Sequence, residues 1–375
     1  MHTAGRTPRH ILISNIRLIG DVILATPLIA ILKKAYPNAT IDFLVGRGTG
    51  EFLERDPDVR TVHYVEPSAG RTLLERNRYL LTLFRSYDLA ITMNASDRGA
   101  LAVLLASSSQ RIGMIHGNDV LKDFWKRLLF THVIPHIPNQ HYIRVCEQVA
   151  QSLSLPVDRL SVQVVWNDQD AALVRETLCT AGVDKPFAVI HPFARWEYKF
   201  WSFEKFAQTS DLLVERYGLV PIWTASPSPQ ECQTLQEAAS LCKHPPVLLA
   251  GCFNLNQMAC LLKQAQVFIG LDTAITHLAA SQETPLVTLF GPTRVSSWSP
   301  WDNRGPVADQ CPKLRGMQRS GNSIVLQSER DCVPCSREGC NNNHLPPPCL
   351  LEITPDQVLD AVATLPLRLT TPSAV

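Results

Sequence analysis

Short apolar runs alternate with helical patterns along the whole chain. In the first half, the apolar runs are residues 10–14, 41–45, 62–65, 89–92 and 111–113, and the helical patterns between them are 22–35, 50–53, 73–84 and 99–106. In the second half, the apolar runs are residues 187–190, 220–223, 247–249, 267–270 and 286–290. Strands that alternate with helices indicate parallel sheets covered on both faces, so the pattern predicts an α/β fold.

The repetition of this pattern predicts two domains. A chain of 375 residues is long enough for two cores of ordinary size. Residues 161–184 have the pattern of a strand and a helix that end in a polar turn, so we place the boundary between a first domain, 1–165, and a second domain, 166–375. Two doubly wound domains in tandem predict a cleft between the carboxyl edges of their sheets, where such folds bind ligands.

Composition and charge narrow the class of protein. The chain is 45% hydrophobic and 18% charged with a net charge of +1, which is typical of a globular protein and argues against a nucleic-acid binder. Residues 1–165 carry 19 Lys and Arg against 14 Asp and Glu, a net +5, whereas the remainder carries 16 against 20, a net −4. A basic first half is consistent with an anionic partner, but such an imbalance is also common on solvated surfaces.

The start of the chain has the pattern of neither a signal peptide nor a membrane span. Residues 1–9 are polar and basic, and no small-residue cleavage site follows the next apolar stretch. That stretch is interrupted by Arg17, Asp21 and Pro27, which argues against a membrane-spanning helix. We therefore expect a cytoplasmic protein whose 11 cysteines stay mostly reduced.

The segment 272–280 joins two predicted buried strands. Asp272 follows the apolar run 267–270, the pattern then turns helical through His277, and the run 286–290 closes a βαβ module. A helix start has unpaired N–H groups and partial positive charge, so it suits a phosphate. An ordinary Asp N-cap on a core-packed helix is the alternative.

Two further loops carry candidate chemistry. Asp21 follows the first predicted strand and begins a helix among apolar neighbours, which would raise its pKa and suit it to general-base catalysis; a simple capping role is the alternative. The loop 191–201 combines charged and aromatic residues directly after a strand. Arg195 or Lys199 would neutralise a phosphate there, and an exposed aromatic side chain would cover a ring of the ligand. The alternative is that the aromatic residues fill the junction between the two domains.

Three motifs, taken together and in this order, carry a family resemblance. They are Gly20-Asp21-Val22 followed by Thr26-Pro27, Lys199-Phe200-Trp201 after a strand, and Asp272-Thr273 with His277-Leu278-Ala279-Ala280 and Phe290-Gly291-Pro292-Thr293. They resemble glycosyltransferase family 9, the ADP-heptose:lipopolysaccharide heptosyltransferases, over nearly the whole chain. Residues 329–335 (Glu-Arg-Asp-Cys-Val-Pro-Cys) further resemble the heptosyltransferase III branch of that family.

The resemblance implies a GT-B fold of two Rossmann-like domains, with the sugar nucleotide held mainly by the second. It implies inverting, metal-independent transfer of a heptose from ADP-L-glycero-D-manno-heptose to the inner core of lipopolysaccharide, by an enzyme peripheral on the cytoplasmic face of the inner membrane. The roles that it implies are Asp21 as the base, Lys199 as the cation on the donor phosphates, Thr273, Ala274 and Thr276 at the diphosphate cradle, Asp272 as the sugar-binding acid, His277 as the motif histidine and Glu231 as the acid at the adenosine ribose.

One position departs from the usual family motif. Many members have glycine where this chain has Ala274, and a methyl group narrows the approach of a backbone to a phosphate. The heptosyltransferase III branch resembles this chain in tolerating alanine. Two other functions therefore stay open: a transferase of the same fold that uses another nucleotide sugar for surface glycans, and a catalytically silent homologue.

Four cysteines cluster in the segment 332–349. They are Cys332, Cys335, Cys340 and Cys349. In a reducing compartment this spacing favours a structural zinc site, with redox pairing or plain packing as the alternatives. We expect no cofactor to be required for catalysis.

A helical pattern over residues 121–129 is the last candidate. Its apolar residues on one face are Leu121, Phe124, Trp125, Leu128 and Leu129, and its basic residues elsewhere are Lys122, Lys126 and Arg127. Such a stripe is typical of core packing. The alternative is an interfacial helix that binds anionic lipid or a phosphorylated glycolipid.

Overall fold

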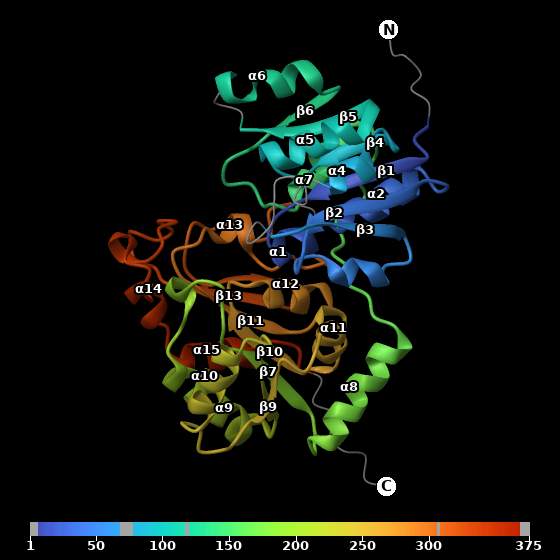
Figure 1. Cartoon of the computed structure of the whole chain (residues 1–375). Coiled ribbons are helices and arrows are strands. Elements are labelled where there is room, and N and C mark those ends of the chain that lie inside the picture. Colours follow the sequence, from blue (N-terminus) through green and yellow to red (C-terminus); the bar gives the residue numbers. More distant parts are fainter. Residues whose placement is uncertain (1–6, 68–77, 117–119, 306–307, 368–375) are drawn as a thin grey trace. The chain divides into compact units, whose positions relative to one another are not determined.

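A computed structural model describes residues 7–67, 78–116, 120–305 and 308–367. The chain divides into two compact units, residues 1–163 and 164–375 (Figure 1). Within these described residues, each unit is built on its own sheet, of six strands in the first unit and seven in the second. Within the described residues, no helix is both long and apolar enough to cross a membrane.

Unit 1 contains a parallel sheet in the order β3-β2-β1-β4-β5-β6. Its elements are β1 (His10–Asn15), α1 (Ile19–Ile23), α2 (Pro27–Ala35), β2 (Thr40–Gly46), η1 (Glu51–Arg55), β3 (Val59–Val65), α4 (Tyr79–Leu83), β4 (Tyr87–Thr92), α5 (Asp97–Ala106), β5 (Ser107–Ile115), α6 (Val120–Leu129), β6 (His132–Pro135) and α7 (Arg144–Ser152). The strand order reverses between β1 and β4. Doubly wound sheets bind their ligands at the carboxyl ends of the strands beside such a reversal.

Three expectations for local structure differ from what is observed. The predicted helix 22–35 is two helices, because Pro27 lacks an N–H group and therefore starts α2 instead of continuing α1. The strand expected near residue 161 does not form, and only the following helix, α8 (Asp168–Thr180), is present. Of the predicted helix 73–84, residues 73–77 lie outside the described part, and α4 spans only Tyr79–Leu83, with Phe84 as its non-helical C-cap.

Unit 2 contains a second sheet in the order β12-β13-β11-β10-β7-β8-β9, parallel except for β12. Its elements after α8 are β7 (Phe187–His191), η2 (Glu197–Lys199), α9 (Phe203–Tyr217), β8 (Val220–Ala225), α10 (Pro229–Ala239), β9 (Val247–Ala250), α11 (Leu255–Gln264), β10 (Val267–Leu271), α12 (Ala274–Ser281), β11 (Leu286–Phe290), α13 (Val295–Trp298), β12 (Gln318–Ser320), β13 (Ser323–Gln327), η3 (Cys340–Asn342), α14 (Pro348–Leu351) and α15 (Pro355–Ala363). Its strand order reverses between β7 and β10.

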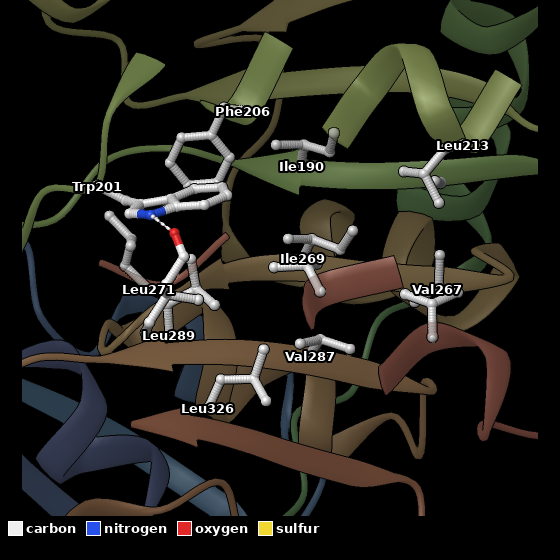
Figure 2. Packing of buried hydrophobic residues seen from close by; sticks show 14 of the residues in the cluster. Ile190, Trp201, Phe206, Leu213, Val267, Ile269, Leu271, Val287, Leu289 and Leu326 are labelled. Atoms are coloured by element: carbon white, nitrogen blue, oxygen red, sulfur yellow. Dashed lines mark hydrogen bonds between the residues drawn. The ribbon is translucent and has the colours of Figure 1, made fainter. Parts of the chain in front are cut away.

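The core of unit 2 holds both ends of the loop 191–201. Phe193 and Trp201 are buried in the same cluster as the strands β7, β10 and β11. Figure 2 shows the Trp201 ring against Phe206, with centroids 4.9 Å apart, and its indole N–H donates to the carbonyl of Ile353 at 3.1 Å. Phe193 and Trp201 therefore pack inside their own unit, and they fix the loop between them at the carboxyl end of β7.

Candidate active site

An ion pair joins the carboxyl ends of β7 and β10 in unit 2. Lys199 ends the short turn η2 after β7, and Asp272 directly follows β10. The Lys199 Nζ and Asp272 Oδ2 atoms lie 2.5 Å apart, and both side chains are largely shielded from solvent. Because β7 and β10 are neighbours where the strand order reverses, this pair lies where a doubly wound sheet is expected to bind its ligand.

The helix α12 starts beside this ion pair. Its N-cap is Thr273 rather than Asp272, so the interpretation of Asp272 as an ordinary cap is wrong; its carboxylate pairs with Lys199 instead. The Thr276 hydroxyl donates to the carbonyl of Leu271 at 2.5 Å and ties the helix start to β10. The hydroxyl of Thr273 is buried and has no hydrogen-bond partner in the structure. The helix start thus offers a polar atom in addition to its partial positive charge.

His277 lies one helical turn after Thr273 and is buried. Burial lowers its pKa to about 4, with the nearby Lys199 charge acting in the same direction and Asp272 in the opposite one. The imidazole is therefore neutral at physiological pH, and its Nδ1 atom has no hydrogen-bond partner. A buried polar group left unpaired costs about 1–3 kcal/mol, so Thr273 and His277 are groups that a ligand or water would satisfy.

The remaining predicted residues of unit 2 lie in two nearby loops. Arg195 is exposed, and its guanidinium carbon lies 5.1 Å from the centre of the Trp196 ring, which stacks on Tyr198. Glu231, in the first turn of α10, accepts a hydrogen bond from the backbone N–H of Ser226 at 2.9 Å and closes the loop after β8. Both loops follow the carboxyl ends of strands of the same sheet.

Asp21 lies at the corresponding edge of unit 1. It is the third residue of α1, whose N-cap is Leu18, and its carboxylate forms hydrogen bonds with the backbone of Leu18 and of Asp21 itself, so the side chain also contributes to capping the helix start. The side chain is 4% exposed, and burial raises its pKa, while Arg17, with Nε 3.1 Å from the carboxylate, opposes the rise. A carboxylate of raised pKa beside the carboxyl end of β1 has the chemistry of a general base.

Three polar residues near the carboxyl ends of β1 and β4 were missed in the sequence. Asn15 donates from Nδ2 to the backbone carbonyl of Asp21 at 3.0 Å, and the Tyr142 hydroxyl lies 3.4 Å from Asn15 Oδ1. Asn94 is buried just after β4; its Oδ1 accepts from the N–H of Ser96, which leaves Nδ2 without a partner. Asn15 and Asn94 close or follow predicted strands, which is the signal that identified Asp21. Tyr142 follows no strand, and nothing in the sequence points to it.

The predicted apolar stripe of α6 is divided between the core and the surface. Trp125 packs inward, with its ring centroid 6.2 Å from that of Phe130, whereas Phe124, Leu128 and Leu129 are exposed. Lys126, expected on the polar side, is 1% exposed. The side chains of Leu121 and Lys122 lie outside the described part.

Two carboxylates and a carbonyl account for the burial of Lys126. Its Nζ lies 3.2 Å from Asp123 and 3.0 Å from Asp97, and it donates to the carbonyl of Ala95 at 2.7 Å. A buried ammonium group needs such partners to offset its lost hydration. Lys126 therefore serves to hold α6 against the start of α5.

The four cysteines of the segment 332–349 interact electrostatically, but in this structure their side chains are not arranged around a common metal position. Cys332, Cys335 and Cys340 are exposed and Cys349 is buried, and all four are free thiols. Burial and the charges of the other three raise the pKa of Cys349 to about 11. Among the described residues, no group of three His, Cys, Asp or Glu side chains is arranged to hold a metal ion. The structural zinc site stays a prediction.

Two doubly wound α/β units in one chain are the architecture of GT-B glycosyltransferases. A sequence profile of glycosyltransferase family 9 (heptosyltransferase) matches residues 78–315. The chain therefore belongs to glycosyltransferase family 9.

Individual relatives agree with this assignment. The chain is 31% identical over 296 residues to lipopolysaccharide heptosyltransferase 3 of Escherichia coli, covering 76% of this chain and 85% of the relative. A family 9 structure from Veillonella parvula has a TM-score of 0.76 at 18% identity, covering 95% and 96% of the two chains. An E. coli heptosyltransferase solved with ADP-2-deoxy-2-fluoro heptose has a TM-score of 0.67 at 18% identity, covering 94% and 99%. These structural likenesses confirm the predicted fold class.

Proposed function

We propose that this enzyme transfers a heptose from ADP-L-glycero-D-manno-heptose to the inner core of lipopolysaccharide, with inversion and without a catalytic metal. The observation that carries the proposal is the Lys199–Asp272 pair beside the start of α12. The similarity to lipopolysaccharide heptosyltransferase 3 supports the acceptor, and the relative solved with an ADP-heptose analogue supports the donor.

Unit 2 holds the donor in this mechanism. The start of α12 and Lys199 bind the diphosphate, and the charge that develops on it when the bond to the sugar breaks is stabilised by both. Asp272 accepts hydrogen bonds from sugar hydroxyls. His277, neutral and with a free ring nitrogen, and the unpaired Thr273 hydroxyl supply further hydrogen bonds to the donor. Glu231 and Arg195 bind the nucleoside and phosphate ends.

Unit 1 activates the acceptor. The acceptor hydroxyl gives its proton to Asp21, its oxygen forms the new bond to the anomeric carbon, and the bond from that carbon to ADP breaks. A single displacement inverts the anomeric configuration. Positive charge from Lys199 and the helix start takes the place that a divalent metal occupies in other transferases.

The acceptor also determines where the enzyme works. We propose that it acts at the cytoplasmic face of the inner membrane, in peripheral contact with the bilayer that carries its lipid-linked acceptor. Nucleic acid is not a partner in this proposal, and no cofactor is required.

The test is transfer to defined acceptors. Purified enzyme is incubated with ADP-heptose and truncated lipopolysaccharides in the presence of EDTA, and the products are weighed and their anomeric configuration is determined by NMR. One added heptose, absent with Asp21→Asn and retained with the exposed control Asp158→Asn, is the expected result. Transfer from UDP- or GDP-sugars instead would favour the other nucleotide sugar, and no transfer from any donor would favour the silent homologue.

A further inference from the structure

Large apolar side chains are exposed on three helices of unit 1. Leu81 of α4 and Phe84, which directly follows α4, are 78% and 55% exposed. Leu101 of α5 is 45% exposed, and Phe124 and Leu128 of α6 are 60% and 74% exposed. We call these five residues the α4–α6 surface. Exposed apolar side chains are ordinary when they are scattered singly, whereas a group of them on adjoining elements marks a contact surface.

The three helices lie on the same face of the sheet of unit 1. Their inner sides share one apolar cluster with the strands, to which Leu83 of α4 and Val103 of α5 belong and against which Trp125 of α6 packs. The buried Lys126 in addition ties α6 to the start of α5 through Asp97. Because the inner sides share one core, the exposed side chains point away from the sheet on the same side of the unit.

Cationic side chains accompany this surface. Arg78, Arg85, Arg98 and Arg127 are exposed on or directly beside the three helices, and the Arg85 guanidinium lies 5.4 Å from the centre of the Phe84 ring. Asp97 is exposed but pairs with Lys126, whereas Asp123 is buried. The described part of this face therefore offers four exposed cations, while both of its carboxylates are engaged by Lys126.

We infer that the α4–α6 surface docks on an anionic lipid bilayer. Leucine and phenylalanine side chains would enter the boundary between headgroups and acyl chains, and the arginines would pair with headgroup phosphates. The charge of the surface favours a negatively charged membrane over a second copy of this unit, whose own α4–α6 surface carries the same cations. The inference deepens the proposed function, since the same bilayer carries the acceptor, but binding to lipid can be measured without transfer.

The experiment is co-sedimentation of the full chain with vesicles. Phosphatidylcholine vesicles with and without phosphatidylglycerol are compared at low and high salt. We expect binding to the anionic vesicles that weakens with salt. The affinity should fall about tenfold or more in Arg98→Gln/Arg127→Gln, since each basic residue near the bilayer contributes about 1 kcal/mol. It should fall about as much in Phe124→Ser/Leu128→Ser, because this variant removes the apolar side chains that would enter the bilayer. The matched control, Leu241→Ser/Leu314→Ser, removes exposed leucines of unit 2 and should bind like the wild type.

Three results would overturn the inference. The first is equal binding to both kinds of vesicle, and the second is unchanged binding of the two α4–α6 variants. The third is self-association without vesicles that is abolished in Phe124→Ser/Leu128→Ser, because it would assign the surface to a second copy of the chain. Transfer to a core oligosaccharide freed of its lipid should be the same in the wild type and the variants. If no heptose is transferred at all but the vesicle pattern holds, the proposed function fails and the docking surface stands.

Discussion

Lys199 and Asp272 are 73 residues apart in the sequence, and their side chains meet at 2.5 Å where the strand order of unit 2 reverses. The pair holds a cation at the start of α12, and the positive charge of Lys199 offsets the negative charge of Asp272. A diphosphate that binds there must compete with Asp272 for the Lys199 ammonium group. The two residues should therefore affect donor binding in opposite ways.

Lys199→Ala should weaken ADP binding by about 10- to 100-fold, because it removes a charged hydrogen bond and leaves Asp272 unpaired beside the phosphates. Asp272→Ala should bind ADP as tightly as the wild type or more tightly, since Lys199 is released, but should lose transfer because the sugar is no longer held. Calorimetric titration with ADP separates the two variants. Weaker ADP binding by Asp272→Ala would contradict this division of roles.

Arg17→Gln should move the acid limb of the pH profile of kcat/KM to higher pH. Burial raises the pKa of Asp21 and the Arg17 charge opposes this, so removing that charge raises the pKa further. A base must be deprotonated, and activity should therefore fall more at pH 6 than at pH 8. Arg159→Gln, an exposed arginine elsewhere in unit 1, is the control. An acid limb that stays in place would show that Asp21 is not the titrating base.

His191 and His277 should make unit 2 sensitive to acid. Burial lowers the pKa of each to about 4, so the unfolded chain binds protons below about pH 6.5 that the folded chain does not. The contribution of each histidine to the free energy of unfolding is fully present above pH 6.5 and is lost as the pH drops toward 4. Between pH 7.5 and 5 the loss is about 2 kcal/mol per histidine. Urea unfolding at the two pH values measures the loss, which should shrink by that amount in His191→Asn. An equal loss in this variant would refute the assignment.

The sequence placed the candidate residues at the ends of strands because both sheets are largely parallel. Every predicted strand directs its last residues to one edge, so Asp21, Lys199 and Asp272 could be assigned to carboxyl ends before any contact was known. No local sequence pattern predicts the strand order that makes β1 and β4 neighbours. Asn94 follows β4, and its proximity to the carboxyl end of β1 appears only when the sheet is assembled.

The burial of single polar residues could not be predicted from the local sequence pattern either. A lysine on a helix is normally solvated, and Lys126 is buried only because Asp97, Ala95 and Asp123 come together around it. In the same orientation of α6, Trp125 packs against the core and Phe124 is exposed. Amphipathic spacing alone does not fix which part of a broad apolar stripe faces the core.

Asn94→Ala should raise the KM for the acceptor about 3- to 10-fold and leave the KM for the donor unchanged. The Nδ2 group is buried without a partner beside the strand pair that leads to Asp21, and a neutral hydrogen bond to an acceptor hydroxyl contributes about 0.5–1.5 kcal/mol. Asn38→Ala, which changes an exposed asparagine of the same unit, is the control. An unchanged acceptor KM, or an equal rise in both KM values, would exclude this role.

The cysteine segment gives the last prediction, because it is attached to unit 2 just after the carboxyl end of β11. The N–H of Ser336 donates to the carbonyl of Pro292 at 2.8 Å, and the charge of Glu338 acts with that of Asp272 in raising the pKa of Tyr198, after the larger effect of burial. Four thiols that close on a zinc ion would fix this segment.

Elemental analysis of the purified full chain should then find about one zinc per molecule. Cys335→Ser/Cys340→Ser should lose the metal and lower the melting temperature, whereas Cys179→Ser, at an exposed cysteine outside the segment, should retain it. Binding requires the thiols to move together from their present positions, so zinc should also protect them from alkylation. An unchanged zinc content in the double variant would leave redox pairing or packing as the role of these cysteines.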